Sequence, residues 1–405
     1  MRLLHTSDWH LGISEHNLDR RPDHDHVLQQ IKDIARAEKV DLILHTGDLF
    51  DREYPGLDIL KYGWQHLEEL EAIAPVAVLC GNHDSAKLFE LMGMILRRRL
   101  RIYFLDLVSL HAGPNGILRL PTADKEQMVI GAVPFVKHAN VVRSFIDEGA
   151  ARSTLLYADF VGNIETQVGK WIGAGYDSRR DIRIFAAHLL VADAQPSTSE
   201  YRFHIESNFA TRAQRIPEAE YVAFGHIHKP QVIPGVLHGR YAGSPIPIDF
   251  GERVDEKCVF LVTGKPGQRL KIEAIPLDIG RKLVQIDGTI DEISQNRENW
   301  RGNIAKVVVD LDEPIAQLDE RVRSILTDTQ VVSVAPRYRR PAAAAVAISS
   351  DGPPQTVSEL FSTYLADNPT TGDLERVNRY FNILLDGVTR GDDDLPFPDL
   401  DEVLK

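Results

Sequence analysis

Short apolar runs that end abruptly in Asp, Asn or His recur along the first half of this chain. The run PVAVLC, at residues 75–80, is followed at once by Gly81, Asn82, His83 and Asp84. A run of four to eight apolar residues between turn signals is typical of a buried strand. A fold that accommodates this pattern must bury each strand and still present the residues that follow it at an accessible edge.

Amphipathic segments separate these apolar runs up to about residue 275. Residues 23–38 carry apolar side chains at Val27, Leu28, Ile31 and Ile34, a spacing that fits one face of a helix. Strands that alternate with helices predict a mostly parallel sheet covered by helices. We therefore expect strands at 2–6, 40–48, 75–80, 182–188, 221–226 and 239–245, helices at 23–38, 57–72, 88–95 and 159–172, and a closing antiparallel pair at 257–263 and 271–277.

The pattern changes at Lys282, and a chain of 405 residues is long enough for two or three domains. Strands at 282–288, 305–311 and 331–336 and helices at 290–299 and 315–327 predict a small β-α-β-α-β unit. A stretch rich in Ala, Pro, Ser and Gly follows and is typical of a linker. The predicted division is a main domain at 1–280, a small α/β domain at 281–340, a linker at 341–354, and helices with an acidic tail at 355–405.

Two short amphipathic helices are predicted in the terminal segment. A capping box of Thr356 and Glu359 begins the first. The pair is too small to form a core of its own, so its apolar faces need a partner, either the rest of this chain or a second protein. The first face carries Val357, Leu360, Phe361, Tyr364 and Leu365, and the second carries Leu374, Val377, Phe381 and Leu384.

The composition indicates a soluble globular protein, with 43% apolar and 26% charged residues. No apolar stretch approaches the roughly 18 residues of a membrane span, and the first residues lack a signal-peptide pattern. Two cysteines exclude a disulfide framework and suit a reducing compartment. Cys80, inside its apolar run, is expected to be a core residue and not a nucleophile. We expect a cytoplasmic protein with no membrane contact.

The net charge of −13 argues against a nucleic-acid partner unless the acidity is concentrated. The last 55 residues carry 12 acidic and four basic side chains, so part of the excess lies in one segment. DNA would have to be held by local positive charge, because phosphate contacts dominate its affinity. Two clusters are candidates, although such runs are often only solvated faces: Arg97, Arg98, Arg99 and Arg101, and Arg337, Arg339 and Arg340.

Side chains that can bind metal follow five of the expected strands. In open α/β sheets, sites form in the crevice at the carboxyl ends of the strands, so these side chains are expected to meet. Each one alone has an ordinary explanation as a turn or a surface histidine, but five unrelated turns would not share one topological position. The residues are Asp8 and His10, Asp48 and Asp51, Asn82, His83 and Asp84, His188, and His226 and His228.

This set of side chains predicts a two-metal site. Carboxylates and imidazoles together suit manganese, iron or zinc better than calcium. Six or seven ligands are too many for one ion and suit two ions that share a bridge. Two ions about 3.5–4 Å apart form a clamp for phosphoryl transfer. Glycines directly before Asp48, Asn82 and His226 would allow sharp turns and the close approach of a phosphate.

The ordered motifs DxH, GDxxD, GNHD, H and GHxH resemble those of the calcineurin-like metallophosphoesterases. Within that superfamily, HTSDWHLG, GDLFDREYP, GNHDS, GHIHKPQ and YAGSPIPIDFGE closely resemble the nuclease subunits of bacterial double-strand-break complexes. The resemblance runs through most of residues 1–275. It implies a four-layered α/β sandwich with two divalent metals, manganese first and magnesium as the alternative. It also implies that the small α/β unit is a capping, DNA-binding domain.

The resemblance assigns a role to each matching residue. One metal would be held by Asp8, His10, Asp48 and His228, and the second by Asp48, Asn82, His188 and His226. His83 would face the scissile phosphate, where it would protonate the leaving 3′ oxygen or stabilise charge, and Asp84 would orient its ring. Archaeal relatives have a second catalytic histidine where this chain has Asp51, so that role is not carried over.

The resemblance also implies partners. The substrate would be DNA, as duplex ends, hairpins and single strands, which would make the protein nucleoid-associated. An ATPase partner would bind the terminal helices, and a homodimer inside a heterotetramer is expected. Docking of these helices onto their own chain is the alternative. The partner-binding side chains would be Leu360, Phe361, Tyr364, Leu365, Val377, Phe381 and Leu384.

Three functions fit the sequence. The leading interpretation is a manganese-dependent DNA nuclease, exonucleolytic on double strands and endonucleolytic on single strands and hairpins, in repair, recombination and replication. A phosphodiesterase for a small nucleotide shares the metal motifs but leaves the chain beyond residue 280 without a purpose. A non-catalytic DNA-end scaffold is the third, and the intact ligand set with His83 speaks against it.

Overall fold

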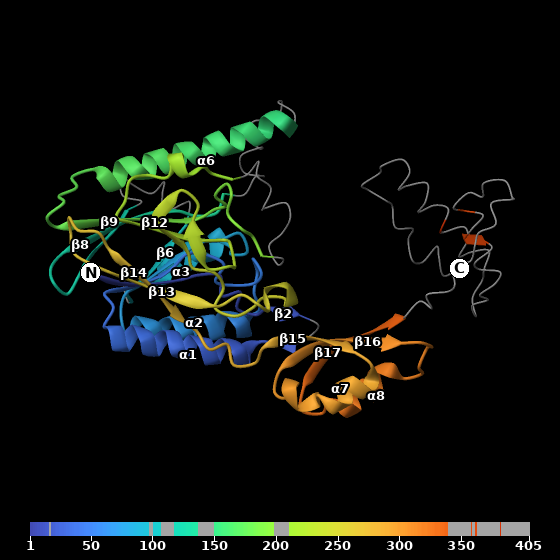
Figure 1. The fold of residues 1–405 in the computed structure, drawn as a ribbon. Coiled ribbons are helices and arrows are strands. Elements are labelled where there is room, and N and C mark those ends of the chain that lie inside the picture. The colour runs from blue at the N-terminus through green and yellow to red at the C-terminus, as the bar shows by residue number, and fades with distance from the viewer. Residues whose placement is uncertain are drawn as a thin grey trace. The chain divides into compact units, whose positions relative to one another are not determined.

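The computed structural model describes residues 1–15, 18–96, 100–106, 117–136, 150–197 and 210–338, together with Ser358, Phe361, Ser362 and Phe381 (Figure 1). The chain divides into two compact units, Met1–Tyr338 and Arg339–Lys405. The first unit contains two six-stranded sheets and a separate three-stranded sheet. All the strand-end residues singled out above therefore belong to this unit.

The first sheet is built around the N-terminal strand. β1 (Arg2–Thr6) pairs in parallel with β4 (Leu42–His45), and β5 (Val76–Leu79) and β6 (Ile102–Leu105) continue the parallel order. On its other side β1 pairs antiparallel with β13 (Cys258–Thr263), which pairs antiparallel with β14 (Lys271–Pro276). The four parallel strands therefore end at one edge.

The second sheet repeats this plan. β8 (Gln127–Val133), β9 (Asp181–His188), β10 (Tyr221–Gly225) and β12 (Val236–Tyr241) are parallel neighbours. β7 (Ile117–Pro121) and β11 (Gln231–Ile233) close the two edges as antiparallel strands. A short hairpin of β2 (Ser14–Glu15) and β3 (Leu18–Asp19) lies outside both sheets.

The two sheets form the middle layers of a four-layered sandwich. α1 (Arg21–Glu38), α2 (Leu57–Glu71) and α3 (Ala86–Leu96) pack on the first sheet, and α6 (Ala150–Gly173) packs on the second, as Figure 1 shows. Successive residues of β1 show how the layers join. Leu3 lies in the core between the two sheets, and Leu4 lies in the core between the first sheet and helices α1 and α2. This alternation is the period of two expected for a strand buried on both faces.

The predicted fold class is confirmed, and two details differ. The alternation of strands and helices, taken alone, predicts a mostly parallel sheet, whereas the structure has two mixed sheets, because the runs at 182–188 and 221–226 belong to a second sheet. The helix at 159–172, expected from the sequence to lie at the surface, is longer in the structure, and α6 buries Val161, Val168 and Ile172 against the second sheet. Strands β6, β7 and β8 were not identified from the sequence.

The small unit is a three-stranded parallel sheet with two helices. β15 (Leu283–Gly288), β16 (Ile304–Leu311) and β17 (Gln330–Tyr338) alternate with α7 (Ile290–Gln295) and α8 (Leu318–Ile325). A capping box of Thr289 and Glu292 begins α7. The unit has an apolar core of its own, around Ile286, Val307 and Val322.

The contacts between this unit and the sandwich include an ion pair and an apolar cluster. Arg281 forms an ion pair with the buried carboxylate of Asp23 in α1, at 2.7 Å. Leu18 and Phe250 from the sandwich pack with Leu283 and Ile304 from the small unit. The β-α-β-α-β order matches the sequence prediction, while the domain boundaries at 280 and 340 stay predictions.

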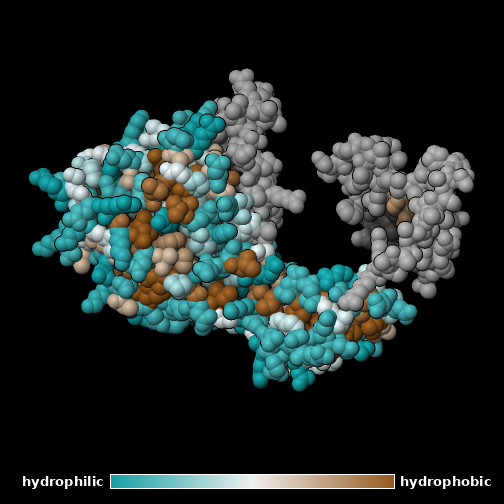
Figure 2. Space-filling model, viewed as in Figure 1, coloured by the Kyte–Doolittle hydropathy of each residue, from teal (hydrophilic) through white to brown (hydrophobic). Residues whose placement is uncertain are grey.

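Most of the face in Figure 2 is hydrophilic, with smaller hydrophobic patches. Among the residues that the structure describes, no helix has the length and apolar character needed to cross a membrane. In the second unit, the rings of Phe361 and Phe381 stack with centroids 3.7 Å apart. The predicted linker and the other predicted partner-binding side chains, Leu360, Tyr364, Leu365, Val377 and Leu384, lie outside the described residues.

Candidate metal centre

Five parallel strands deliver the metal-binding side chains to one edge of the sandwich. Asp8 and His10 follow β1, and Asp48 follows β4. Asn82 and His83 follow β5, His188 is the last residue of β9, and His226 and His228 follow β10. The carboxyl ends of β1, β4 and β5 in one sheet thus face those of β9 and β10 in the other, and the predicted residues come together.

Asp8, His10 and His228 form one half of the cluster. Their candidate ligand atoms all lie within 4.8 Å of one another. The Nε2 atoms of His10 and His228 are 3.2 Å apart. A neutral imidazole carries only one N–H, so two such nitrogens and a carboxylate facing the same space are a set of lone pairs suited to a cation.

Asn82, His188 and His226 form the other half. The amide oxygen of Asn82 lies 2.8 Å from His188 Nε2 and 2.9 Å from His226 Nδ1. Asp48 connects the halves, because its Oδ2 lies 3.3 Å from His188 Nε2 and 3.7 Å from His10 Nε2. The cluster could therefore hold two divalent ions with Asp48 between them.

The charges of the cluster are strongly coupled. Burial opposes ionisation of Asp48, but the adjacent His188 holds the pKa of its carboxyl well below the usual range. Burial likewise disfavours the imidazolium of His188, yet Asp48 and Asp8 raise its pKa to about 9. Buried carboxylates in this surrounding require positive charge, and divalent ions meet the same requirement. The donor set therefore fits a metal centre.

The backbone around the cluster is strained in several places. Asp8, His10 and Asp48 have φ angles of 52°, 47° and 54°, in the left-handed region. Hydrogen bonds between the loops after β1 and β4 hold this geometry, since Asp8 N donates to Gly47 O at 2.9 Å and His10 N to Asp48 O at 3.0 Å. Gly81 makes room for Asp48, because a Cβ there would lie 2.1 Å from Asp48 Oδ1. Such strain persists where the surroundings fix it, and it clusters at functional sites.

The family model of the calcineurin-like phosphoesterases matches residues 1–230, more than half of the chain. The chain belongs to this family. Its members are metal-dependent hydrolases, so this chain is an enzyme of that class, and the family implies divalent metals at the cluster.

Curated relatives of this phosphoesterase share a name. The SbcD subunit of the SbcCD nuclease from Escherichia coli (strain K12) is 29% identical over 336 residues, 82% of each chain. The protein of that name from Bacillus subtilis (strain 168) is 28% identical over 293 residues, 70% of this chain and 72% of its own. A solved dimetal phosphatase from Danio rerio is 11% identical and covers 68% of this chain and 98% of its own, with a TM-score of 0.36. The match to the family model carries the family assignment.

His83 lies beside the cluster of this phosphoesterase. Its ring centroid is 4.7 Å from that of His10, and its backbone N donates to Asp48 Oδ1 at 2.8 Å. A ligand atom of His83 also lies within 4.8 Å of ligand atoms of His10 and Asp48, so proximity alone would allow His83 to bind metal. The ring is half-buried, at the border between cluster and solvent.

The structure corrects the role expected for Asp84. Its buried carboxylate accepts hydrogen bonds from the backbone N–H groups of Gly81, Leu49 and Phe50, at 2.9, 3.2 and 3.0 Å. His83 Nδ1 instead lies 2.8 Å from the carbonyl oxygen of Asp51. Asp84 therefore fixes the loops after β4 and β5 to each other. Burial and the nearby Asp48 raise its pKa to about 7.

Two carboxylates lie beside the second ring nitrogen of a metal-binding histidine. The sequence did not predict these contacts. Glu252 Oε1 lies 2.9 Å from His228 Nδ1, and Asp51 Oδ1 lies 3.4 Å from His10 Nδ1. Asp51 is at a strand end and could have been assigned by position. Glu252 is separated from His228 by 24 residues and follows no metal-binding strand, so only its place in the motif YAGSPIPIDFGE could have drawn attention to it.

The described arginines of the proposed DNA-binding clusters are engaged within the chain. Arg101 Nε donates to Glu71 at 2.8 Å. Arg337 donates to Asp310 at 2.6 Å and to Asp287 at 2.9 Å. DNA binding at the two positions stays a prediction. The other five, Arg97, Arg98, Arg99, Arg339 and Arg340, lie outside the described residues.

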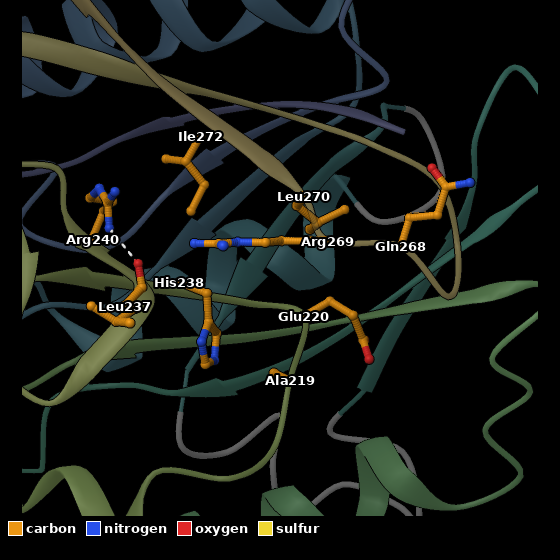
Figure 3. Close-up of a pocket in the computed structure, with 9 residues that line it drawn as sticks. All are labelled: Ala219, Glu220, Leu237, His238, Arg240, Gln268, Arg269, Leu270 and Ile272. Carbon is orange, nitrogen blue, oxygen red and sulfur yellow. Dashed lines mark hydrogen bonds between the residues drawn. The ribbon is translucent and has the colours of Figure 1, made fainter.

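A pocket of about 490 Å³ lies at the far end of the second sheet (Figure 3). Its lining includes Glu220, Arg240 and Arg269, and Figure 3 shows the Arg269 side chain extending across it. Glu220 is already paired with Arg183, at 2.8 Å. Glu220 precedes β10 and His226 follows it, so the length of this strand separates the pocket from the metal centre.

Proposed function

We propose that this phosphoesterase is the nuclease subunit of an SbcCD-like complex. It would hydrolyse DNA phosphodiester bonds with two manganese ions, as an exonuclease on double strands and an endonuclease on single strands and hairpins. The observation that carries the proposal is the set of seven metal-binding side chains with His83 beside it, in a chain similar over 82% of its length to a named SbcD nuclease. Repair, recombination and replication of DNA, at the nucleoid, would be its setting.

The metal assignment follows the two halves of the cluster. Asp8, His10 and His228 would hold one ion, Asn82, His188 and His226 the other, with Asp48 shared. When bound, the ions would act as Lewis acids on the scissile phosphate and activate water for attack. Carboxylate and imidazole ligands suit manganese, with magnesium as the alternative. Asp51 and Glu252 would keep the His10 and His228 rings aligned.

His83 would bind the phosphate and transfer a proton to the leaving group. The contact of Nδ1 with the Asp51 carbonyl requires a proton on Nδ1, which makes Nε2 the nitrogen that gives or takes a proton. A leaving 3′ oxygen needs a proton as its bond to phosphorus breaks, and an imidazolium can supply it. The Asp51 carbonyl thus holds the ring in a fixed orientation.

The decisive experiment compares His83→Ala with the wild-type chain on end-labelled linear and hairpin duplexes, with manganese and with chelator. Cleavage by the wild type should require manganese and stop with chelator. In the variant it should fall by about 10²–10⁴-fold, the usual contribution of a general acid or base. Bound manganese, measured by elemental analysis, should stay unchanged.

The matched control is His26→Ala, because His26 is an exposed histidine of α1 outside the cluster. It should cleave like the wild type. Absence of cleavage by the wild type, even with an SbcC-like ATPase and ATP, would reject the nuclease. A nucleotide substrate screen would then test the small-molecule phosphodiesterase. Full cleavage by His83→Ala would reject only the proposed role of His83 and would leave the nuclease assignment intact.

We also propose that the second unit binds the SbcC-like ATPase. The Phe361 and Phe381 rings stack with an interplanar angle of 16°, which supports a paired arrangement of the two amphipathic segments. Deletion of residues 355–390 should preserve manganese-dependent cleavage and abolish association with the ATPase. Co-purification of the shortened chain with the ATPase would contradict this proposal. The small unit, with the boundaries 281–340, would serve as the capping domain on the DNA side.

A homodimer within a heterotetramer completes the proposed assembly. Leu91, Met94 and Ile95 in α3 are 52%, 73% and 61% exposed, and their spacing places them on one face of the helix. An exposed apolar face of this kind is typical of an interaction site. Met94→Glu should shift the chain toward the monomer in sedimentation experiments.

A further inference from the structure

Glu252 is one of the most enclosed carboxylates in the described part of the chain, with 0% of its surface exposed. Oε1 accepts from His228 Nδ1 at 2.9 Å. Oε2 accepts from Lys257 Nζ at 2.6 Å and from Ile248 N at 3.1 Å. Burying a carboxylate is unfavourable unless it is paired and hydrogen-bonded, and Glu252 meets both conditions.

The segment around Glu252 is built to hold it in place. Glu252 ends a short 3₁₀ helix, η4 (Phe250–Glu252), whose N-cap Asp249 accepts from the N–H groups of Gly251 and Glu252. Lys257 Nζ donates to Glu252 and also to the backbone oxygen of His228, at 3.1 Å. Lys257 and Glu252 thus hold the backbone and the ring of His228 from two directions.

This arrangement fixes the state of the His228 ring. A carboxylate accepts a hydrogen bond from Nδ1–H, so the neutral ring has its lone pair on Nε2. Nε2 is the atom that lies 3.2 Å from His10 Nε2, within the Asp8–His10–His228 half of the cluster. A carboxylate on the second nitrogen of a metal-binding histidine also makes the ring a stronger ligand.

Support of a different kind holds His188 in the other half of the cluster. His188 Nδ1 lies 2.8 Å from the backbone oxygen of Thr46, a neutral acceptor. Apart from the shared Asp48, the candidate ligands of this half are two imidazoles and an amide, whereas the first half has the carboxylate of Asp8. Candidate ligand atoms of Asp8 also lie within 4.8 Å of those of Asp48 and His188, so its charge is close to both halves, and the carboxylate of Glu252 on His228 is what distinguishes the Asp8–His10–His228 half.

We propose that Glu252 is a positioning residue for His228, and that it makes the Asp8–His10–His228 half of the centre the tighter metal site, which fills before the Asn82–His188–His226 half. The proposal rests on the metal-dependent hydrolase assignment and not on the choice of substrate. It predicts two unequal metal affinities in one chain and names the residue that sets the tighter one.

The test is a manganese titration of the metal-free full chain, followed by calorimetry and by the electron paramagnetic resonance signal of free manganese. The wild type should show a tight and a weak class of site. Glu252→Gln keeps an oxygen near Nδ1 but removes the charge, and it should weaken the tight class by about 10–100-fold. The weak class should stay within about threefold of the wild type.

Glu220→Gln is the matched control. Glu220 is a partly buried, ion-paired glutamate at the far end of β10 (Figure 3), so its loss reports any general effect of removing such a pair. Its isotherm should superimpose on that of the wild type. Superposition of the Glu252→Gln isotherm on the wild type, or equal weakening by Glu220→Gln, would overturn the proposal.

A second measurement on the unmodified chain guards against misfolding of the variant. Nitrogen-15 labelling of the histidines in the metal-free protein reports which ring nitrogen carries the proton, and a His228→Gln spectrum assigns the signal. The proposal requires the Nδ1–H form at His228. An Nε2–H form would overturn it. Neither readout depends on DNA cleavage, so failure of the nuclease proposal and failure of this one are distinguishable.

Discussion

Two glutamates in this molecule are equally buried, with 0% of each exposed, and carry opposite tendencies to ionise. Glu252 lies beside the metal centre, and Glu165 lies in α6, which covers the second sheet. Burial opposes the ionisation of both. Lys257 and His228 nevertheless hold the pKa of Glu252 far below its usual range, while burial raises the pKa of Glu165 to about 7.

The partners of each carboxylate explain the difference. Glu252 has a buried ammonium group at 2.6 Å and several further donors. Glu165 Oε2 accepts from the Thr211 hydroxyl at 2.8 Å, and Oε1 has no hydrogen-bond partner among the described residues. Arg215 favours the ionised form of Glu165 only weakly, because its own ion pair is with Asp159 at the surface. Burial alone therefore does not decide the charge of a side chain, and a complete set of partners does.

The largest effect should come from removing the cation beside Glu252. Lys257→Met has a similar volume but leaves a buried carboxylate without its counter-charge, so it should lower the free energy of unfolding by about 3–5 kcal/mol. Chemical denaturation in the presence of chelator measures this without a contribution from bound metal. Lys271→Met removes an exposed lysine that pairs with Glu273, and it should change stability by less than about 1 kcal/mol. Equal losses in the free energy of unfolding for Lys257→Met and Lys271→Met would refute the claim that Glu252 depends on its buried counter-charge.

The Glu165 carboxyl should make stability depend on pH. Its folded pKa of about 7 lies above the unfolded value of about 4.3, so the folded state binds the extra proton between these values. Stability should fall as pH rises through this range. Glu165→Gln mimics the protonated form, and it should be nearly neutral at pH 5 and stabilising by roughly 1–3 kcal/mol at pH 8.

Thermal unfolding of the metal-free chain at several pH values measures this prediction. The control is Asp159→Asn, an exposed carboxylate on the same helix that pairs with Arg215. It should shift stability by less than about 1 kcal/mol and leave the slope between pH 5 and pH 8 unchanged. A Glu165→Gln chain with the wild-type slope would show that Glu165 is ionised in the folded state.

Much of the metal centre could be predicted because its residues sit at strand ends, where topology alone brings them together. Asp8, Asn82 and His188 are far apart in sequence, but parallel strands share one edge. The alternation of strand and helix patterns likewise predicted the β-α-β-α-β order of the small unit. The second sheet was harder, because β7 and β8 carry no polar residue that marks their ends as part of the site.

The hydrogen bonds around the metal centre could not be predicted from the spacing of residues in the sequence. Glu252 reaches His228 from a loop after β12, and nothing in the periodicity of that loop predicts the contact. Asp84 shows the opposite error, since adjacency to His83 suggested a side-chain contact that backbone hydrogen bonds replace. The register of a loop decides such partners, and a single sequence does not specify it.

The smallest effect should come from Thr211, which supplies the hydroxyl to Glu165 Oε2. Thr211→Val keeps the shape and removes this donor, so it should destabilise the chain by about 1 kcal/mol at pH 5. The hydroxyl favours the ionised form, so its loss should raise the folded pKa further and extend the fall in stability beyond pH 7. In a Glu165→Gln background the same substitution should add no pH dependence, because no titrating group remains at the position. A pH slope in the double variant that differs from the slope of Glu165→Gln alone would assign the effect of Thr211 to another titrating group and remove Glu165 from the comparison.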